Sequence, residues 1–337
     1  MGKYMRGMTN WLQENLHGYD VIYVDAAREE LMAAVETAQD SGTVVLGRCR
    51  GGGQSSDIQW WESSRNGKRC ITAAKKAQGL VVEDAETQKE LLIHGIETPL
   101  FFRIPQGVYQ LPITSHQERW VIRQQLARAN TDLATEADTP VLLCHAEMSS
   151  SSGLELLVGV SRLLLLRYPN LRIWLVGDGP NRDSVYNSLR AEGVRASVAI
   201  PGSFSDPSDV FRAANLYFQA GDEGLQFFLP LAISLQMPII SIDHPSIRRI
   251  FSFDGQESAV ASGVPPSSGQ HALDLVTWCD PSRPKTIKEG IISVLEDLPQ
   301  AMSRAETLRD SMLRHRPESK TLDAQIDAIH RVSRNEL

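Results

Sequence analysis

Short apolar segments alternate with amphipathic ones along most of the chain. Segments with the length and apolar content of buried strands lie at 21–24, 43–46, 80–82, 101–104, 141–145, 173–176 and 198–200. Residues 86–94 have helical spacing and end at Gly95, a typical C-terminal cap. This alternation predicts an α/β fold in which helices cover parallel sheets.

A polar stretch at 130–140 has no apolar period and is the best candidate for a linker. We therefore expect a first domain at 1–130, a second domain at 131–300 and an amphipathic helical tail at 301–337, which could return to the first domain. A length of 337 residues fits two domains of ~150 residues each.

Composition narrows the functional classes. The net charge of −7, without a dense basic tract, argues against a protein that binds nucleic acid. Four widely spaced cysteines (Cys49, Cys70, Cys144 and Cys279) indicate free thiols and no metal site. No apolar run reaches the ~20 residues of a transmembrane segment, and no secretory signal is visible, so a cytoplasmic protein is expected.

Candidate chemistry gathers between 171 and 242. A predicted strand ends at Gly177-Asp178-Gly179-Pro180, another ends before Gly202, and Asp222-Glu223-Gly224 precedes an apolar segment. The glycine turns could approach a ligand, or could simply be tight connections that need positive φ. Glu223 could contact a ligand, or could be an acidic residue favoured at a helix N-terminus.

The order of several motifs resembles the retaining glycosyltransferases of family 4, whose GT-B architecture has two Rossmann-like domains. The motifs are Leu175–Pro180, Ala214-Asn215, Glu223-Gly224, Met237–Ile240, Ile104–Val108 and Gly153. The resemblance implies that a nucleotide-sugar donor lies against the second domain and that no further cofactor is needed. Glu223 would contact the donor sugar as the catalytic carboxylate. The implied donor-binding residues are Gly177, Asp178, Gly179, Gly202, Ser203 and Gly224. The acceptor would be a carbohydrate or a lipid-linked molecule.

Three positions depart from the family pattern. Glu147 falls where the family has an Arg, Ser152 where it has a Lys, and Leu231 where it has a second Glu. Cations that stabilise a leaving diphosphate are therefore missing, and two charges ~5 Å apart interact by roughly 3 kcal/mol at an effective dielectric near 20. Two hypotheses stay open: a hexosyltransferase-like, retaining enzyme, or a non-catalytic pseudoenzyme that binds a protein partner in carbohydrate assembly. A nicotinamide dehydrogenase is excluded because the fingerprint glycines are absent.

The first domain is expected to be abbreviated, because the opening strand and glycine turn of the family have no counterpart before the helix predicted at 4–16. It has one segment that is a candidate binding site. Arg48, Arg50, Gly51, Gly52 and Gly53 could form an anion-holding loop on the acceptor side, or a plain surface loop. Trp60-Trp61 could stack on a sugar, although buried core tryptophans are more common. His145 and His244 have no partners at metal-ligand spacing and are expected to be structural.

Overall fold

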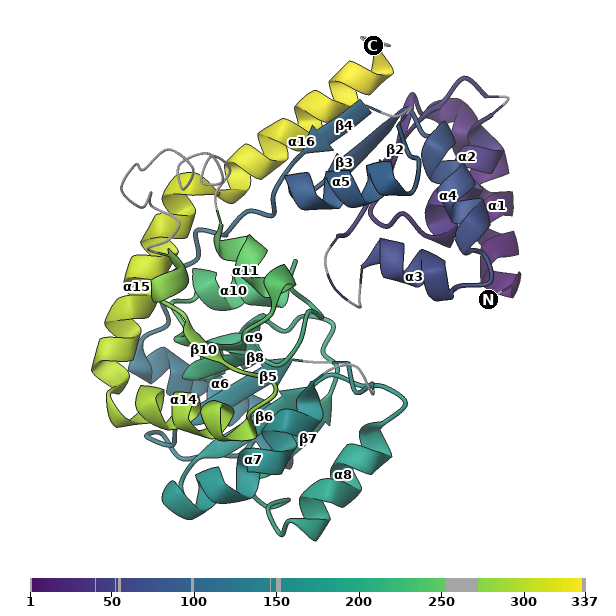
Figure 1. The fold of residues 1–337 in the computed structure, drawn as a ribbon. Coiled ribbons are helices and arrows are strands. Elements are labelled where there is room, and N and C mark those ends of the chain that lie inside the picture. The colour runs from purple at the N-terminus through teal and green to yellow at the C-terminus, as the bar shows by residue number, and fades with distance from the viewer. Residues whose placement is uncertain are drawn as a thin grey trace. The chain divides into compact units, whose positions relative to one another are not determined.

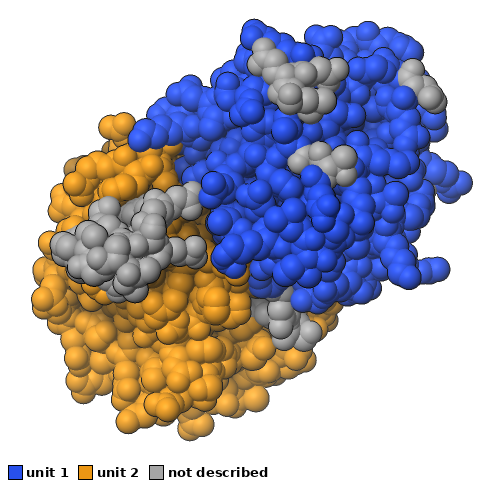
Figure 2. Space-filling view, turned by 45° about the horizontal axis from the view of Figure 1, so that its top comes forward, with its two compact units in different colours: residues 1–107, 318–337 blue, residues 108–317 orange. Residues whose placement is uncertain are grey.

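The computed structural model describes residues 2–39, 41–51, 53, 56–97, 100–145, 147–149, 153–252 and 272–334. The chain divides into two compact units (Figures 1 and 2). Unit 1 comprises 1–107 and 318–337, and unit 2 comprises 108–317. Each unit is built around its own parallel sheet, so the predicted α/β fold with two Rossmann-like domains is confirmed.

Unit 1 holds a four-stranded parallel sheet in the order β1-β2-β3-β4. Its strands are β1 (Val21–Val24), β2 (Val44–Arg48), β3 (Gly79–Val82) and β4 (Leu100–Arg103). Its helices are α1 (Gly2–Asn15), the short 3-10 helix η1 (Leu16–Gly18), α2 (Glu29–Ala38), α3 (Asp57–Ser63), α4 (Gly67–Lys76), α5 (Ala85–Ile93) and α16 (Glu318–Ser333). The four predicted strands and the helix ending before Gly95 are confirmed, with Gly95 at a φ of 71°.

Both faces of the unit 1 sheet are covered. Alternate strand residues point to opposite faces. On one face, Leu80 packs with side chains of the helices between the strands. On the other face, Leu46 and Val81 pack with Ala328 and Val332 of α16. The C-terminal helix therefore returns to the first unit (Figure 1).

Unit 2 holds a six-stranded parallel sheet in the order β10-β9-β8-β5-β6-β7. Its strands are β5 (Val141–His145), β6 (Arg172–Val176), β7 (Val198–Gly202), β8 (Leu216–Gln219), β9 (Ile239–Ile242) and β10 (Thr277–Cys279). The chain builds from β5 to β7 on one side, then crosses to β8 and continues on the other side. The boundary between β5 and β8 is therefore the topological switch point, beside which ligands bind in open α/β sheets.

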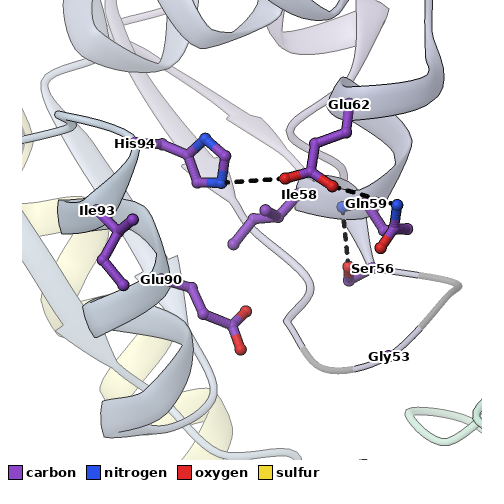
Figure 3. Close-up of a pocket in the computed structure, with 8 residues that line it drawn as sticks. All are labelled: Gly53, Ser56, Ile58, Gln59, Glu62, Glu90, Ile93 and His94. Atoms are coloured by element: carbon purple, nitrogen blue, oxygen red, sulfur yellow. Dashed lines mark hydrogen bonds and ion pairs between the residues drawn. The ribbon is translucent and has the colours of Figure 1, made fainter.

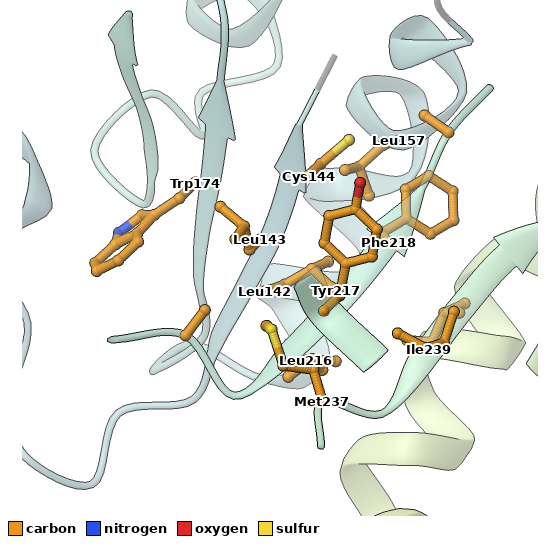
Figure 4. Close-up of a cluster of buried hydrophobic side chains, with 14 of the residues drawn as sticks. Leu142, Leu143, Cys144, Leu157, Trp174, Leu216, Tyr217, Phe218, Met237 and Ile239 are labelled. Atoms are coloured by element: carbon orange, nitrogen blue, oxygen red, sulfur yellow. The ribbon is translucent and has the colours of Figure 1, made fainter. Parts of the chain in front are cut away.

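The helices of unit 2 enclose a single large apolar core. They include α6 (His116–Ala129), the 3-10 helix η2 (Thr131–Leu133), α7 (Leu154–Arg167), α8 (Arg182–Ala191), α9 (Ser208–Ala213), α10 (Phe228–Ser234), α11 (Pro245–Phe251), α14 (Pro284–Glu296) and α15 (Leu298–His315). Figure 4 shows side chains of the central strands in this core, among them Trp174, Tyr217 and Phe218. Burial of such large side chains supplies most of the favourable free energy of folding.

The boundary between the units differs from the expected one near residue 130. It lies at 107/108, and α6 belongs to unit 2. Arg123 of α6 is 1% exposed and donates hydrogen bonds to the carbonyls of Ala213 and Thr139 and to the Asn215 side chain. A buried guanidinium satisfied in this way fixes the helix to the core of unit 2. The expected separate tail is also divided, because α15 belongs to unit 2 and α16 to unit 1.

None of the helices in the described parts of the chain is both long and apolar enough to cross a lipid bilayer.

Candidate functional site

The predicted donor-side residues all lie at the carboxyl edge of the unit 2 sheet, either at the end of a strand or in the loop that follows one. Gly177, Asp178 and Gly179 follow β6, Gly202 and Ser203 lie at the end of β7, and Glu223 and Gly224 follow β8. In a parallel sheet these strand ends meet at one edge, and β5 and β8 flank the switch point. The structure thus brings the predicted residues to one edge of one sheet.

Glu223 joins the loops on the two sides of the switch point. Its Oε2 accepts a hydrogen bond from the backbone N–H of Glu147 at 2.7 Å, and its Oε1 accepts one from the Ser149 hydroxyl at 3.2 Å. Burial raises the pKa of the Glu223 carboxyl; the hydrogen bonds lower it, and the nearby charge of Glu147 raises it. Since α10 begins only at Phe228, Glu223 does not occupy the first turn of a helix. The interpretation of Glu223 as a helix N-terminal acid is therefore wrong.

The turn at 177–181 is a tight connection. Gly177 has a φ of 137° and donates its N–H to the Gly202 carbonyl at 3.0 Å. A Cβ on Gly179 would lie 2.6 Å from the Met148 carbonyl oxygen, and the Asn181 N–H donates to that same oxygen at 2.8 Å. A larger residue at 179 would push the loop after β5 away from this turn. Contact of these glycines with a ligand stays a prediction.

Arg182 is a candidate residue that the sequence interpretation missed. Its Nη2 donates to the Ile200 carbonyl at 3.0 Å, and its Nη1 lies 3.5 Å from an oxygen of the Asp178 carboxylate. The same guanidinium lies beside Gly202, whose φ is 90°. Arg182 therefore links the turn after β6 to the end of β7. The sequence could have indicated this residue, because Arg182 is the first residue of the helix that follows the glycine turn.

Next to the loop after β8, the Phe228 ring packs against Gly224, where a side chain would not fit. Gly224 has a φ of 67°, and a Cβ there would lie 2.3 Å from the Phe228 ring. The Phe228 ring stacks on His145, with centroids 3.4 Å apart. Burial lowers the pKa of His145 to about 4, so the imidazole is neutral near pH 7. His244 caps α11 by accepting the Ser246 N–H.

The structure describes two of the three positions that depart from the family pattern. Glu147 is exposed, and Leu231 packs against the core of unit 2. Ser152 lies outside the described residues. Arg248, which follows β9, is held by both oxygens of Asp243 and lies over the Trp278 ring at 4.6 Å. Arg248 is therefore already engaged in an ion pair with Asp243.

In unit 1, both arginines of the predicted acceptor-side loop form ion pairs within the unit. Arg48 is 5% exposed; its guanidinium lies 2.9 Å from Glu83 and 3.6 Å from Asp25. Arg50 pairs with Asp25 at 2.8 Å. These pairs occupy the cations that would hold an anion, although the proposed role of the loop itself remains a prediction.

The described glycines of the same loop are required for different reasons. A Cβ on Gly51 would lie 1.8 Å from the Thr87 hydroxyl oxygen, so the backbone passes directly over α5. Gly53 has a φ of 76°, and Gly52 lies outside the described residues. Asp57 then anchors the loop by accepting the backbone N–H groups of Ala27 and Arg50.

Trp60 and Trp61 contribute to the packing of unit 1. Trp61 is 2% exposed and donates its indole N–H to the Ala27 carbonyl at 2.6 Å, so the core interpretation of this residue is confirmed. Trp60 is half-buried, and the Arg28 guanidinium lies over its ring at 5.5 Å.

Unit 1 also has a pocket of 360 Å³ between α3 and α5 (Figure 3). Its lining residues are Gly53, Ser56, Ile58, Gln59, Glu62, Glu90, Ile93 and His94. His94 and Gln59 both approach the Glu62 carboxylate, at 3.7 Å and 3.2 Å. The pocket thus adjoins the loop predicted for the acceptor side.

Comparison with known proteins agrees with this geometry. Residues 139–277 match the family model described as "Glycosyl transferases group 1". No curated protein sequence matches the chain. Solved structures share its fold at low sequence identity, and three of them, at 11–13% identity, are described next.

Anabaena HepE, in complex with UDP and glucose, has a TM-score of 0.71 and 13% identity over 96% of this chain and 80% of its own. S. aureus TarM, a mutant in complex with fondaparinux, alpha-GlcNAc-glycerol and UDP, has a TM-score of 0.68 and 11% identity over 95% of this chain and 57% of its own. A UDP-forming alpha,alpha-trehalose-phosphate synthase from Burkholderia xenovorans, in complex with glucose-6-phosphate, has a TM-score of 0.66 and 12% identity over 97% and 77%. Residues 139–277 are therefore similar to glycosyl transferases of group 1, and the whole chain has the fold of GT-B glycosyltransferase structures, with two Rossmann-like domains.

Proposed function

We propose that the protein is a glycosyltransferase that takes a sugar from a nucleotide-sugar donor and passes it to a carbohydrate or lipid-linked acceptor. The proposal is supported by the observation that the family match and the candidate site fall on the same part of the chain. The family match at 139–277 spans the switch-point loops, and these loops hold Glu223 and the glycine turns. HepE and TarM, which share the fold, were solved with UDP bound.

In this proposal the turns at 177–179 and 202–203 lie against the nucleotide, and Glu223 and Gly224 lie at the donor sugar. Glu223 would exchange its bonds to Glu147 and Ser149 for bonds to sugar hydroxyls. Retention of configuration at the sugar carbon is expected from the family 4 resemblance. The loop at 48–53 would serve the acceptor.

A second function, a non-catalytic binding or scaffold protein with a protein partner, is favoured by one specific observation. Glu147 carries a negative charge where the family has a cation, and its N–H already occupies the Glu223 carboxylate. A donor diphosphate would meet repulsion at this point.

Calorimetric titration with UDP-, GDP- and ADP-sugars separates the two functions, together with an assay for release of the nucleoside diphosphate. The transferase predicts micromolar binding of one donor and slow release of its nucleotide. Binding without release in the presence of candidate acceptors would support the second function. Absence of heat at millimolar concentrations of every donor would exclude the proposed transferase.

A further inference from the structure

A buried polar pair stands directly beneath the Glu223 turn. Gln219 is the last residue of β8 and is 1% exposed, and Tyr217 lies two residues before it at 0%. The Gln219 amide nitrogen donates to the carbonyls of Gly221 at 2.6 Å and Glu223 at 2.9 Å. Its amide oxygen accepts the Tyr217 hydroxyl at 2.9 Å. All of the hydrogens of the amide group are thus used.

The chemistry of the partners fixes the direction of these bonds. Backbone carbonyls only accept, so the group that faces Gly221 and Glu223 must be the NH₂ of Gln219. Burial raises the pKa of Tyr217 well above its usual value, so its hydroxyl stays protonated and donates. A buried network in which every member is satisfied selects one geometry, because any other leaves a polar group without a partner.

The bonds continue from the turn to the opposite side of the switch point. Gln219 holds the backbone of Glu223, and the Glu223 carboxylate holds the Glu147 N–H and the Ser149 hydroxyl. The end of β8 is thereby connected to the loop after β5 through one carboxylate. Nothing in the sequence motif of a glutamate followed by a glycine requires such a support.

We propose that Gln219 is a positioning residue, which sets the Glu223 carboxylate at the switch point and, through it, the loop at 147–149. The inference rests on the proposed function only where donor affinity is concerned. Its structural part concerns the bond between Glu147 and Glu223 and stands on its own.

The test is a double-substitution cycle of Gln219→Met and Ser149→Ala in the full chain. Gln219 acts on the Glu223 backbone and Ser149 on its carboxylate, so the two changes meet at one residue. The first readout is the hydrogen-exchange rate of the Glu147 amide. We expect Gln219→Met to speed this exchange roughly tenfold, in proportion to one lost hydrogen bond, and Ser149→Ala to add nothing further in that background.

The second readout is the dissociation constant for the UDP-sugar that binds the wild-type protein best. We expect Gln219→Met to raise it about tenfold, whereas Gln226→Met, a buried glutamine in the same connection, leaves it unchanged. Tyr217→Phe removes one hydroxyl and is expected to act in the same direction with less risk to folding. An unchanged exchange rate in both Gln219→Met and Tyr217→Phe, or strictly additive effects in the cycle, would overturn the inference. A wild-type protein that binds no donor would instead refute the proposed function, and the exchange cycle would still decide the inference.

Discussion

The backbone N–H of Glu147 donates a 2.7 Å hydrogen bond to the carboxylate of Glu223, so two acidic residues meet across the switch point of unit 2. The family resemblance places an Arg at 147, which would attract the donor diphosphate. The exposed Glu147 reverses that charge. The backbone contact orders the loop, whereas the side-chain carboxylate of Glu147 would repel an anionic ligand.

Restoring the family charges should strengthen donor binding. In the combined substitution Glu147→Arg, Ser152→Lys and Leu231→Glu, the two new cations replace a repulsion with attractions to the diphosphate of roughly 3 kcal/mol each at ~5 Å, before screening by solvent. The new carboxylate at 231 supplies a hydrogen-bond acceptor for the ribose hydroxyls. We expect the dissociation constant for a UDP-sugar to fall by at least about tenfold, measured by calorimetry. Glu192→Arg on the exposed end of α8 reverses a charge outside the site and serves as the matched control. Equal gains from both proteins would attribute the effect to net charge alone.

The raised pKa of Glu223 predicts a pH dependence of stability. Because the folded state holds this proton more tightly than the unfolded state, the contribution of Glu223 to stability falls as pH rises from the ordinary value of 4.5 through the raised folded pKa. Above that window the contribution is constant. Urea unfolding across this window should show a steeper loss of stability for the wild-type protein than for Glu223→Gln. Parallel curves for the two proteins would contradict the assignment.

We expect the buried carboxylate of Asp57 to make a large contribution to the stability of unit 1. Its carboxylate is 0% exposed and accepts hydrogen bonds from Ala27 N–H, Arg50 N–H and the Arg28 guanidinium. Asp57→Asn places an amide hydrogen against one of these donors, and we expect a loss of about 3 kcal/mol in the free energy of unfolding, measured with urea. Asp20→Asn makes the same chemical change at an exposed position of unit 1. A loss of similar size in both variants would show that the buried network has no special weight.

Arg182 connects the turn after β6 to the end of β7, and we expect this connection to support donor binding. Replacing it with Gln removes the guanidinium that binds the Ile200 carbonyl and lies near Asp178. We expect a UDP-sugar to bind about tenfold more weakly, with little change in the melting temperature, because the side chain is partly exposed. The comparison protein is Arg190→Gln, at the exposed far end of the same helix. Unchanged affinity in Arg182→Gln would exclude Arg182 from the site.

Much of the fold could be predicted because strand and helix periodicity are local properties of the sequence. The strand at 141–145 has the predicted bounds, and the strand predicted at 173–176 differs by one residue. The unit boundary could not be predicted in this way. The assignment of α6 to unit 2 depends on Arg123, whose guanidinium donates to the Ala213 carbonyl far away in the chain.

The candidate site was predictable to a similar degree. Glycines at strand ends mark the turns, since positive φ is a property of the residue itself. The partners of Glu223 and the role of Gln219 depend on which backbone groups the finished turn presents. The pairing of Arg48 with Glu83 likewise joins the ends of two strands that are distant in sequence.

The most direct test of the account is a crystal structure of the protein soaked with UDP-glucose. The account predicts the nucleotide against the turns at 177–179 and 202–203, with a sugar hydroxyl bonded to the Glu223 carboxylate in place of Ser149 or the Glu147 N–H. A nucleotide bound away from the carboxyl edge of the unit 2 sheet, with both Glu223 bonds intact, would contradict it.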